Sequence, residues 1–198
     1  MKNIILIILV LLSSCGFSQR QNNWRDGHVE LDSIPLTAYE YKERGKRKSA
    51  NGDKQGAIDD YTRAIMVEPT YDTAYHNRGV VRADIGYYKD AILDYTKAIE
   101  INPHFAASYF SRANAKVDLR DNKGALSDYS KAIELNPRFI DPYVNRGVLK
   151  SEMGDYEGEI ADYHLAIKHC EPSVNLYNNL GRALYASVSY THLRAHET

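Results

Sequence analysis

The sequence predicts an all-α fold built as an array of stacked helix pairs. Three observations lead to this prediction: tyrosines recur every 34 residues, apolar residues between them follow helical spacing, and prolines close successive repeats. One helix pair cannot bury its apolar face alone. Neighbouring repeats are therefore expected to stack and share a continuous core.

Four positions of the repeat carry the same or a similar residue every 34 residues, and each such set is called a column. Each first helix carries a tyrosine and, four residues later, a small residue, while each second helix carries a tyrosine and then an alanine. The columns are Tyr41, Tyr75, Tyr109, Tyr143, Tyr177; Gly45, Gly79, Ala113, Gly147, Gly181; Tyr61, Tyr95, Tyr129, Tyr163; and Ala64, Ala98, Ala132, Ala166. Nine of the 16 tyrosines thus belong to the architecture and do not indicate a binding surface.

Residues 72–105 show how one repeat is expected to fold. The apolar spacing predicts a first helix over about 72–85, a turn at Gly86 and a second helix over about 88–101. Pro103 then ends the repeat, because proline cannot continue a helix.

The spacing Tyr…Gly…Ala…Tyr…Ala…Pro in 34 residues resembles the tetratricopeptide repeat. The resemblance implies a right-handed superhelical array of helix-turn-helix units and covers Ala38 to about Ser187. The expected segments are a signal peptide (1–19), a polar tether (20–37), four complete units (38–71, 72–105, 106–139, 140–173), the first helix of a truncated fifth unit (174–187) and a tail of different origin (188–198).

Unit four departs from the pattern at one position. Glu159 stands where the other units carry alanine, at Ala57, Ala91 and Ala125. A long ionisable side chain at this position predicts that the fourth helix pair packs less closely than the others.

A column of arginines precedes a column of aspartates by 16 residues. The pairs are Arg44 and Asp60, Arg78 and Asp94, Arg112 and Asp128, and Arg146 and Asp162. An offset of 16 across a helical hairpin can bring two side chains face to face, so we expect ion pairs within or between units. An exposed pair contributes only ~0–1 kcal/mol, and their expected role is to fix the register of the helices.

The N-terminal stretch MKNIILIILVLLSSCGFSQ has the pattern of an export signal. Its apolar run, Ile4 to Leu12, is shorter than the roughly 20 residues that a transmembrane helix needs. Leu12-Ser13-Ser14-Cys15 resembles the bacterial lipobox, which implies lipidation of Cys15 and a periplasm-facing envelope lipoprotein. Gly16-Phe17-Ser18 before Gln19 also fits cleavage to a soluble exported protein. The lipoprotein is the favoured alternative, and its lipid would be the only link to a membrane.

Residues 188–198, VSYTHLRAHET, interrupt the repeat pattern. Read back into DNA in one frame, they resemble read-through of a transposon adapter used for sequencing libraries. We therefore expect this tail to be non-native and the natural chain to continue past Ser187. His192 and His196 have a spacing that suits a metal on a helix, but within such a tail they predict no metal site.

Composition and motifs argue against several function classes. The formal net charge of −1, from 25 basic and 26 acidic residues, gives no electrostatic reason to expect nucleic-acid binding. Two cysteines exclude a disulfide framework, and Cys170 is expected to be a small, partly buried helix residue. The chain has no nucleophile elbow, phosphate-binding loop or supported carboxylate pair, so we predict neither an enzyme nor a cofactor.

The resemblance also implies a binding groove, because the first helices of tetratricopeptide units line a concave face that holds extended peptides. The residues carried over to that face are Lys42, Lys46, His76, Asn77, Val80, Phe110, Asn114, Val144, Asn145, Val148, Asn178 and Asn179. Asparagine offers a donor and an acceptor and can read a peptide backbone. The alternative is that these asparagines are only solvated. We expect a peptide or protein partner with an acidic end near Lys42 and Lys46. An apolar segment of it would lie against Val80, Phe110 and Val148.

The two-carboxylate clamp of chaperone-binding tetratricopeptide proteins is matched only in part. Lys42 and Asn77 fit that pattern, whereas Lys46, Ala107 and Ser111 replace its remaining residues. A chaperone C-terminus is therefore not the expected partner. The function predicted first is an interaction scaffold. Two alternatives stay open: the docking or sensing arm of a longer protein, and a structural spacer in an envelope complex.

Overall fold

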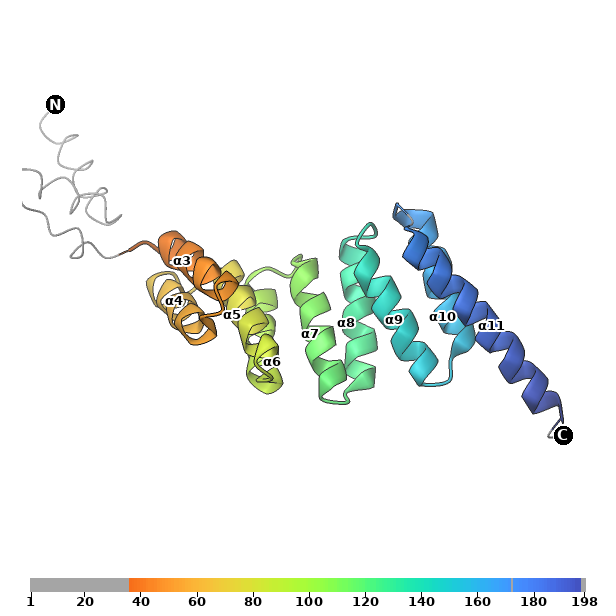
Figure 1. The fold of residues 1–198 in the computed structure, drawn as a ribbon. Coiled ribbons are helices and arrows are strands. Elements are labelled where there is room, and N and C mark those ends of the chain that lie inside the picture. Colours follow the sequence, from red (N-terminus) through yellow and green to blue (C-terminus); the bar gives the residue numbers. More distant parts are fainter. Residues whose placement is uncertain (1–35, 172, 197–198) are drawn as a thin grey trace, which may run out of the picture. The chain divides into compact units, whose positions relative to one another are not determined.

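The computed structural model describes residues 36–171 and 173–196, and within these ranges all regular structure is α-helical (Figure 1). The helices are α3 (Ala38–Ala50), α4 (Lys54–Val67), α5 (Asp72–Asp84), α6 (Tyr88–Ile101), α7 (Ala106–Asp118), α8 (Asn122–Leu135), α9 (Ile140–Glu152), α10 (Tyr156–His169) and α11 (Val174–His196). The predicted all-α class is confirmed. The signal peptide and Cys15 lie outside the described residues.

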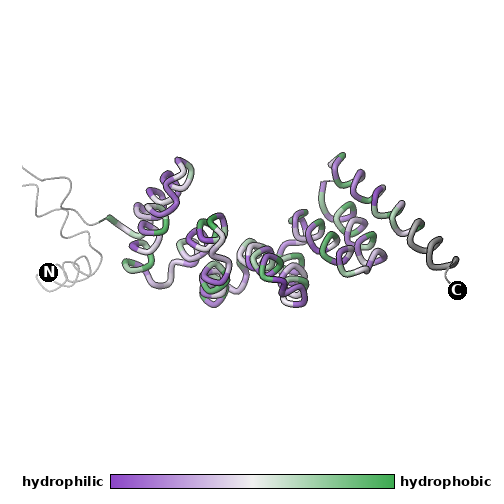
Figure 2. Tube along the Cα trace, turned by 60° about the horizontal axis from the view of Figure 1, so that its bottom comes forward, coloured by the Kyte–Doolittle hydropathy of each residue, from purple (hydrophilic) through white to green (hydrophobic). Residues whose placement is uncertain are grey.

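Consecutive helices pack against each other along the whole array. Hairpins form between α3 and α4, α5 and α6, α7 and α8, and α9 and α10, and the second helix of each hairpin contacts the first helix of the next unit. The helices expected over 72–85 and 88–101 are α5 and α6. In Figure 2 hydrophilic and hydrophobic positions alternate along the helices, as expected when each helix buries one face.

In each hairpin turn, one residue before the second helix has a left-handed backbone conformation, with positive φ. Gly52, Gly86 and Gly154 have φ values of 87°, 84° and 84°, a region where glycine carries no steric cost, and Arg120 takes this conformation in unit three with φ 63°. Aspartates then cap the second helices of units one, three and four. Asp53, Asp121 and Asp155 accept a hydrogen bond from the backbone N–H of Gly56, Gly124 and Gly158, respectively.

The two helices of a unit meet where a tyrosine ring lies over a glycine. A Cβ atom added to Gly79 would lie 2.8 Å from Cε1 of Tyr95, so only glycine fits without a shift. At Gly147 the corresponding distance to Tyr163 is 3.2 Å, still tighter than ordinary contact. This distance is longer than those at Gly45 (3.0 Å) and Gly79 (2.8 Å), so the helices of unit four approach slightly less closely at this point, in the direction expected from Glu159. The backbone oxygen of Glu159 would lie 3.4 Å from a Cβ added to Gly147, and Glu159 also lines a hollow described below.

The predicted ion pairs between the arginine and aspartate columns are confirmed within units. Arg78 donates to Asp94 through Nε at 3.0 Å and Nη2 at 2.7 Å, and the other three units repeat this two-point contact. A second cation, Arg82 in this unit, also contacts the carboxylate. The Nη1 atom of Arg78 reaches back to Oγ1 of Thr62 in the preceding unit at 3.0 Å. The same arginine therefore joins the two helices of its unit and two neighbouring units.

The last helix differs from the sequence-based expectation in length. The first helix of the fifth unit was expected over 174–187, whereas α11 continues to His196. Residues 188–196 contain neither proline nor glycine, so nothing in their backbone chemistry ends the helix. The foreign origin of residues 188–198 stays a prediction. None of the helices over the described ranges has the length and apolar character that a membrane crossing requires.

Candidate functional site

Five of the predicted groove residues line two adjoining hollows on units three to five. Asn114, Asn145 and Val148 line the first, with a volume of about 260 Å³. Val148, Asn178 and Asn179 line the second, with a volume of about 1010 Å³. Val148 and Glu152 line both hollows, so the two adjoin at α9.

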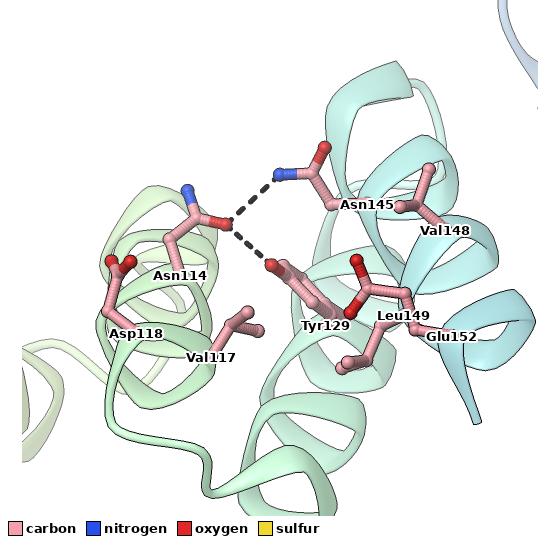
Figure 3. A pocket seen from close by; sticks show the side chains of 8 residues that line it. All are labelled: Asn114, Val117, Asp118, Tyr129, Asn145, Val148, Leu149 and Glu152. Carbon is pink, nitrogen blue, oxygen red and sulfur yellow. Dashed lines mark hydrogen bonds between the residues drawn. The ribbon is translucent and has the colours of Figure 1, made fainter.

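A hydrogen-bonded cluster of three side chains forms the polar part of the first hollow (Figure 3). Oδ1 of Asn114 on α7 accepts from the hydroxyl of Tyr129 at 2.6 Å and from Nδ2 of Asn145 on α9 at 3.0 Å. Burial raises the pKa of Tyr129 to about 12, so its hydroxyl remains a donor well above neutral pH. The cluster fixes both asparagine amides, because Asn114 must present its carbonyl to two donors.

The same cluster leaves two amide groups for a ligand. Nδ2 of Asn114, a donor, and Oδ1 of Asn145, an acceptor, take no part in the hydrogen bonds between described residues. In Figure 3 both atoms point away from Tyr129. A donor and an acceptor held side by side match the C=O and N–H groups of an extended peptide.

The remaining walls of the first hollow are apolar and acidic. Val117, Val148 and Leu149 line it with hydrocarbon, and the carboxylates of Asp118 and Glu152 stand at opposite sides (Figure 3). Its lining contains no lysine or arginine. The first hollow therefore combines apolar surface, two oriented amides and two negative charges.

The second hollow lies between α9, α10 and α11. Its lining includes three tyrosines, two glutamates and one arginine, namely Tyr163, Tyr177, Tyr185, Glu152, Glu159 and Arg182. Glu159 is only 8% exposed and accepts a hydrogen bond at 3.0 Å from the hydroxyl of Tyr163. Burial raises the pKa of Tyr163, and the neighbouring carboxylate of Glu159 raises it further.

Two other predicted groove residues, His76 and Val80, pack between units. Nδ1 of His76 lies 2.9 Å from Oγ of Ser108, and its ring centroid lies 4.9 Å from that of Phe105 and 5.6 Å from that of Tyr95. Burial lowers the pKa of His76 to about 4, so the ring is neutral at physiological pH. Val80 packs against the cluster around Tyr95.

Phe110 and Val144 also take part in packing. The Phe110 ring lies 6.0 Å from that of Tyr129 and 5.0 Å from that of Phe139, measured between centroids. Val144 packs on the cluster that contains Tyr143. These side chains support the walls of the array and line neither hollow.

The lysines of unit one and Asn77 of unit two lie apart from the hollows. Nζ of Lys42 lies 2.6 Å from Oε1 of Glu43 and 4.4 Å from the centroid of the Tyr39 ring. Lys46 is exposed and Asn77 is half-buried. None of the three lines either hollow, so an acidic ligand end near the lysines stays a prediction.

Sequence reasoning missed several residues of the two hollows. Tyr129 and Tyr163 stand in a column assigned to architecture, and the sequence carries no signal for the direction of their hydroxyls. Asp118 and Glu152 lie four and seven residues after Asn114 and Asn145, a helical spacing that could have placed them on the same face. Glu159 was noticed only as a departure from the repeat.

The described residues offer little for metal or thiol chemistry. No group of three or more histidine, cysteine, aspartate or glutamate side chains lies within them in an arrangement that could hold a metal ion. Cys170 is half-buried, with its Sγ atom 3.7 Å from the carbonyl oxygen of Pro137, and burial raises the pKa of its thiol.

Comparison with known families and structures identifies the repeat. Two models of the tetratricopeptide repeat match residues 73–105 and 106–139. No curated protein matches the sequence significantly.

Solved structures share the fold at low sequence identity. The crystal structure of MamA is 25% identical, with a TM-score of 0.67 over 76% of this chain and 82% of that one. The tetratricopeptide domain of Arabidopsis OM64 is 26% identical, with a TM-score of 0.57 over 58% of this chain and 95% of that one. The first tetratricopeptide domain of RPAP3, solved with an HSP90 peptide, is 23% identical, with a TM-score of 0.58 over 59% of this chain and 93% of that one.

Proposed function

This chain is a tetratricopeptide repeat protein, and from that premise we propose that it is an interaction scaffold that binds an extended segment of a peptide or protein. The observation that carries the proposal is the cluster of Asn114, Tyr129 and Asn145 beside an apolar wall. The cluster presents one donor and one acceptor in fixed orientation. Such a pair recognises a peptide backbone with little demand on the ligand's side chains.

The apolar part of the ligand meets Val148 in this proposal. Val148 is 42% exposed and lines both hollows, so a side chain laid against it can continue from one hollow into the other. Val80 and Phe110, which the family pattern also offered, are engaged in packing against other side chains of the array. An acidic residue of the ligand would approach exposed Lys46, and Lys42 could join it only by leaving Glu43.

The HSP90 peptide of RPAP3 is not carried over to this chain. The two share the fold, but Lys46, Ala107 and Ser111 replace three residues of the two-carboxylate clamp. We propose a ligand that binds through its backbone at Asn114 and Asn145, and not through a carboxylate terminus.

A selection from a library of random peptides capped at both ends tests this function. The affinity of the selected peptides is then measured with Asn145→Ala, which leaves the bond between Tyr129 and Asn114 in place. We expect affinity to fall about tenfold, because one hydrogen bond to a dehydrated backbone group is lost.

Two comparisons make this test interpretable. Asn51→Ala, in the exposed turn after α3, is the matched control and should leave affinity unchanged. A thermal melt of each variant shows whether the array remains folded. Selected peptides that bind equally well to wild type and Asn145→Ala would contradict the proposed site.

We also propose that the protein is anchored in the bacterial envelope through Cys15. The lipobox-like Leu12-Ser13-Ser14-Cys15 supports this proposal. Stable anchoring takes more than one acyl chain, which a lipoprotein cysteine carries in the multi-acylated form that the lipobox implies. Cys15→Ser should move the protein from the membrane fraction to the soluble one. A mature N-terminus at Gln19 in the wild type would contradict lipidation.

A further inference from the structure

The second hollow contains a buried carboxylate where the repeat has a methyl group. Glu159 is 8% exposed, whereas the equivalent Ala57, Ala91 and Ala125 are 0% exposed and simply fill the helix contact. Burying a carboxylate costs free energy unless the charge finds partners. The backbone oxygen of Glu159 lies against Gly147 as that of Ala57 lies against Gly45, so the carboxylate is an addition to the helix contact that the repeat already makes.

Glu159 lacks the partners that the other buried carboxylates have. Asp162, one turn further along α10, contacts both Arg146 and Lys150. Over the ranges that the structure describes, Glu159 receives one hydrogen bond, from Tyr163, and no cation lies within salt-bridge distance of it. Arg182 lines the same hollow but forms no ion pair with it there.

The surroundings of Glu159 suit a positively charged organic group. Tyr163, Tyr177 and Tyr185 line the hollow, and aromatic rings attract ammonium and guanidinium groups. Glu152 stands where the second hollow meets the first, and Asp118 lies across the first hollow from it. The two hollows together are lined by three acidic side chains and one arginine, so their lining has a net negative charge.

We propose that the second hollow binds a lysine or arginine side chain of the ligand through Glu159. The inference rests on the proposed function, because it names a residue of the same extended ligand. Peptide backbone at Asn114 and Asn145 and an apolar contact at Val148 place the next ligand side chain at the mouth of the second hollow. Its volume of about 1010 Å³ accommodates a long basic side chain.

The inference adds charge polarity to the ligand. Units four and five take the basic residue, and the lysines of unit one favour an acidic residue at the other end. Such a ligand carries a lysine or arginine within the bound segment. It therefore differs from a ligand that is recognised by its terminal carboxylates.

The same capped random-peptide library tests the inference. We expect peptides selected by the wild-type chain to be enriched in lysine or arginine over the starting library. Replacing that residue by alanine in a selected peptide should lower affinity roughly tenfold to a hundredfold, the effect of losing a charge-assisted hydrogen bond. Glu159→Gln should lower the affinity of the basic peptide by a similar factor and leave that of its alanine version unchanged.

Two further variants keep the inference falsifiable if Glu159→Gln weakens the fold. Glu152→Gln alters an exposed residue and should reduce the preference for basic peptides without affecting folding. Arg182→Ala should preserve or increase that preference.

The outcomes separate this inference from the proposed function. Peptides that depend on Asn145 but show no enrichment in basic residues would overturn the inference alone. Enrichment that persists in the Glu152→Gln/Glu159→Gln double variant would also overturn it. Peptides whose binding ignores Asn145 would overturn the proposed function instead.

Discussion

Asp94 is only 3% exposed, and three donor groups surround its carboxylate. Arg78 contacts both oxygens, and Arg82 adds a second cation at 2.8 Å. In each of the four units, an arginine and a second cation take the place of the water that burial removes from the aspartate. Each of these four buried aspartates is therefore paired with cations, whereas Glu159 has no cation within salt-bridge distance among the described residues.

A double-mutant cycle measures the coupling between Arg78 and Asp94. We expect a coupling free energy of about 1–3 kcal/mol from the unfolding of wild type, Arg78→Ala, Asp94→Ala and the double variant. The exposed pair of Lys97 and Glu100 is the matched control, and its cycle should give less than about 0.5 kcal/mol. Equal coupling free energies in the two cycles would show that the buried arginine–aspartate pair stabilises the fold no more than an exposed ion pair does.

The buried ring of His76 predicts a pH dependence of stability. Its pKa falls from 6.5 to about 4 on folding, so below pH 6.5 the unfolded chain takes up a proton that the folded chain refuses. The free energy of unfolding should therefore fall as pH drops from 6.5 toward 4, by roughly 2–3 kcal/mol from this group.

His76→Gln is the matched variant for this titration, since glutamine can still hydrogen bond to Ser108 but does not titrate. Urea denaturation of both proteins between pH 7 and pH 4.5 should show a smaller loss for the variant. If the free energy of unfolding fell equally with pH in both proteins, protonation of His76 would not be the cause of the loss.

The sequence could predict some site residues and not others. Asn145 shares its repeat position with Asn77 and Asn179, whereas Asn114 stands at the position of Val80 and Val148. The family resemblance was enough to assign both asparagines to the concave face. The three-residue cluster needed the structure, because Tyr129 comes from the other helix of the unit. Likewise the family resemblance offers Phe110 as a groove residue, but its contacts with Tyr129 and Phe139 depend on how α7 packs within its own unit.

At the scale of helices, the glycine column should respond differently along the array. Gly79 meets Tyr95 at 2.8 Å, whereas nothing lies within 4 Å of a Cβ added to Gly181 on α11. Gly79→Ala should cost about 1–3 kcal/mol through overpacking. Gly181→Ala should stabilise α11 by up to about 1 kcal/mol through helix propensity.

Urea denaturation of the two alanine variants measures this difference. Their midpoints should move in opposite directions from that of the wild type. Similar shifts for Gly79→Ala and Gly181→Ala would mean that the close contact between α5 and α6 does not require glycine.

Helix positions were largely predictable because local chemistry ends each element. Pro103 and the turn at Gly86 fixed the ends of α6 and α5 to within a residue or two. The end of α11 was not predictable from repeat register, since the residues after 187 have no helix-breaking chemistry of their own. The surroundings of the Glu159 carboxylate were also not predictable, because sequence does not show that it accepts from the hydroxyl of Tyr163 and lines a hollow beside α11.

At the scale of the whole array, the repeat predicted which helices would touch but not where hollows would open. Both hollows depend on how α7, α9 and α11 are spaced by the second helices between them. A ligand that binds across these units should therefore depend on several of them together, and its affinity should fall when the stacking of units three and four is weakened.

Site-specific photo-crosslinking of a selected capped peptide tests the central claim most directly. A photoreactive phenylalanine analogue would replace Val148, on the wall shared by both hollows, or Leu93, on the outer face of α6. Leu93 is 67% exposed and Val148 is 42% exposed, so accessibility alone favours the control position. The account predicts a crosslink from position 148 that unlabelled peptide abolishes, and none from position 93. A crosslink from position 93 alone would contradict it.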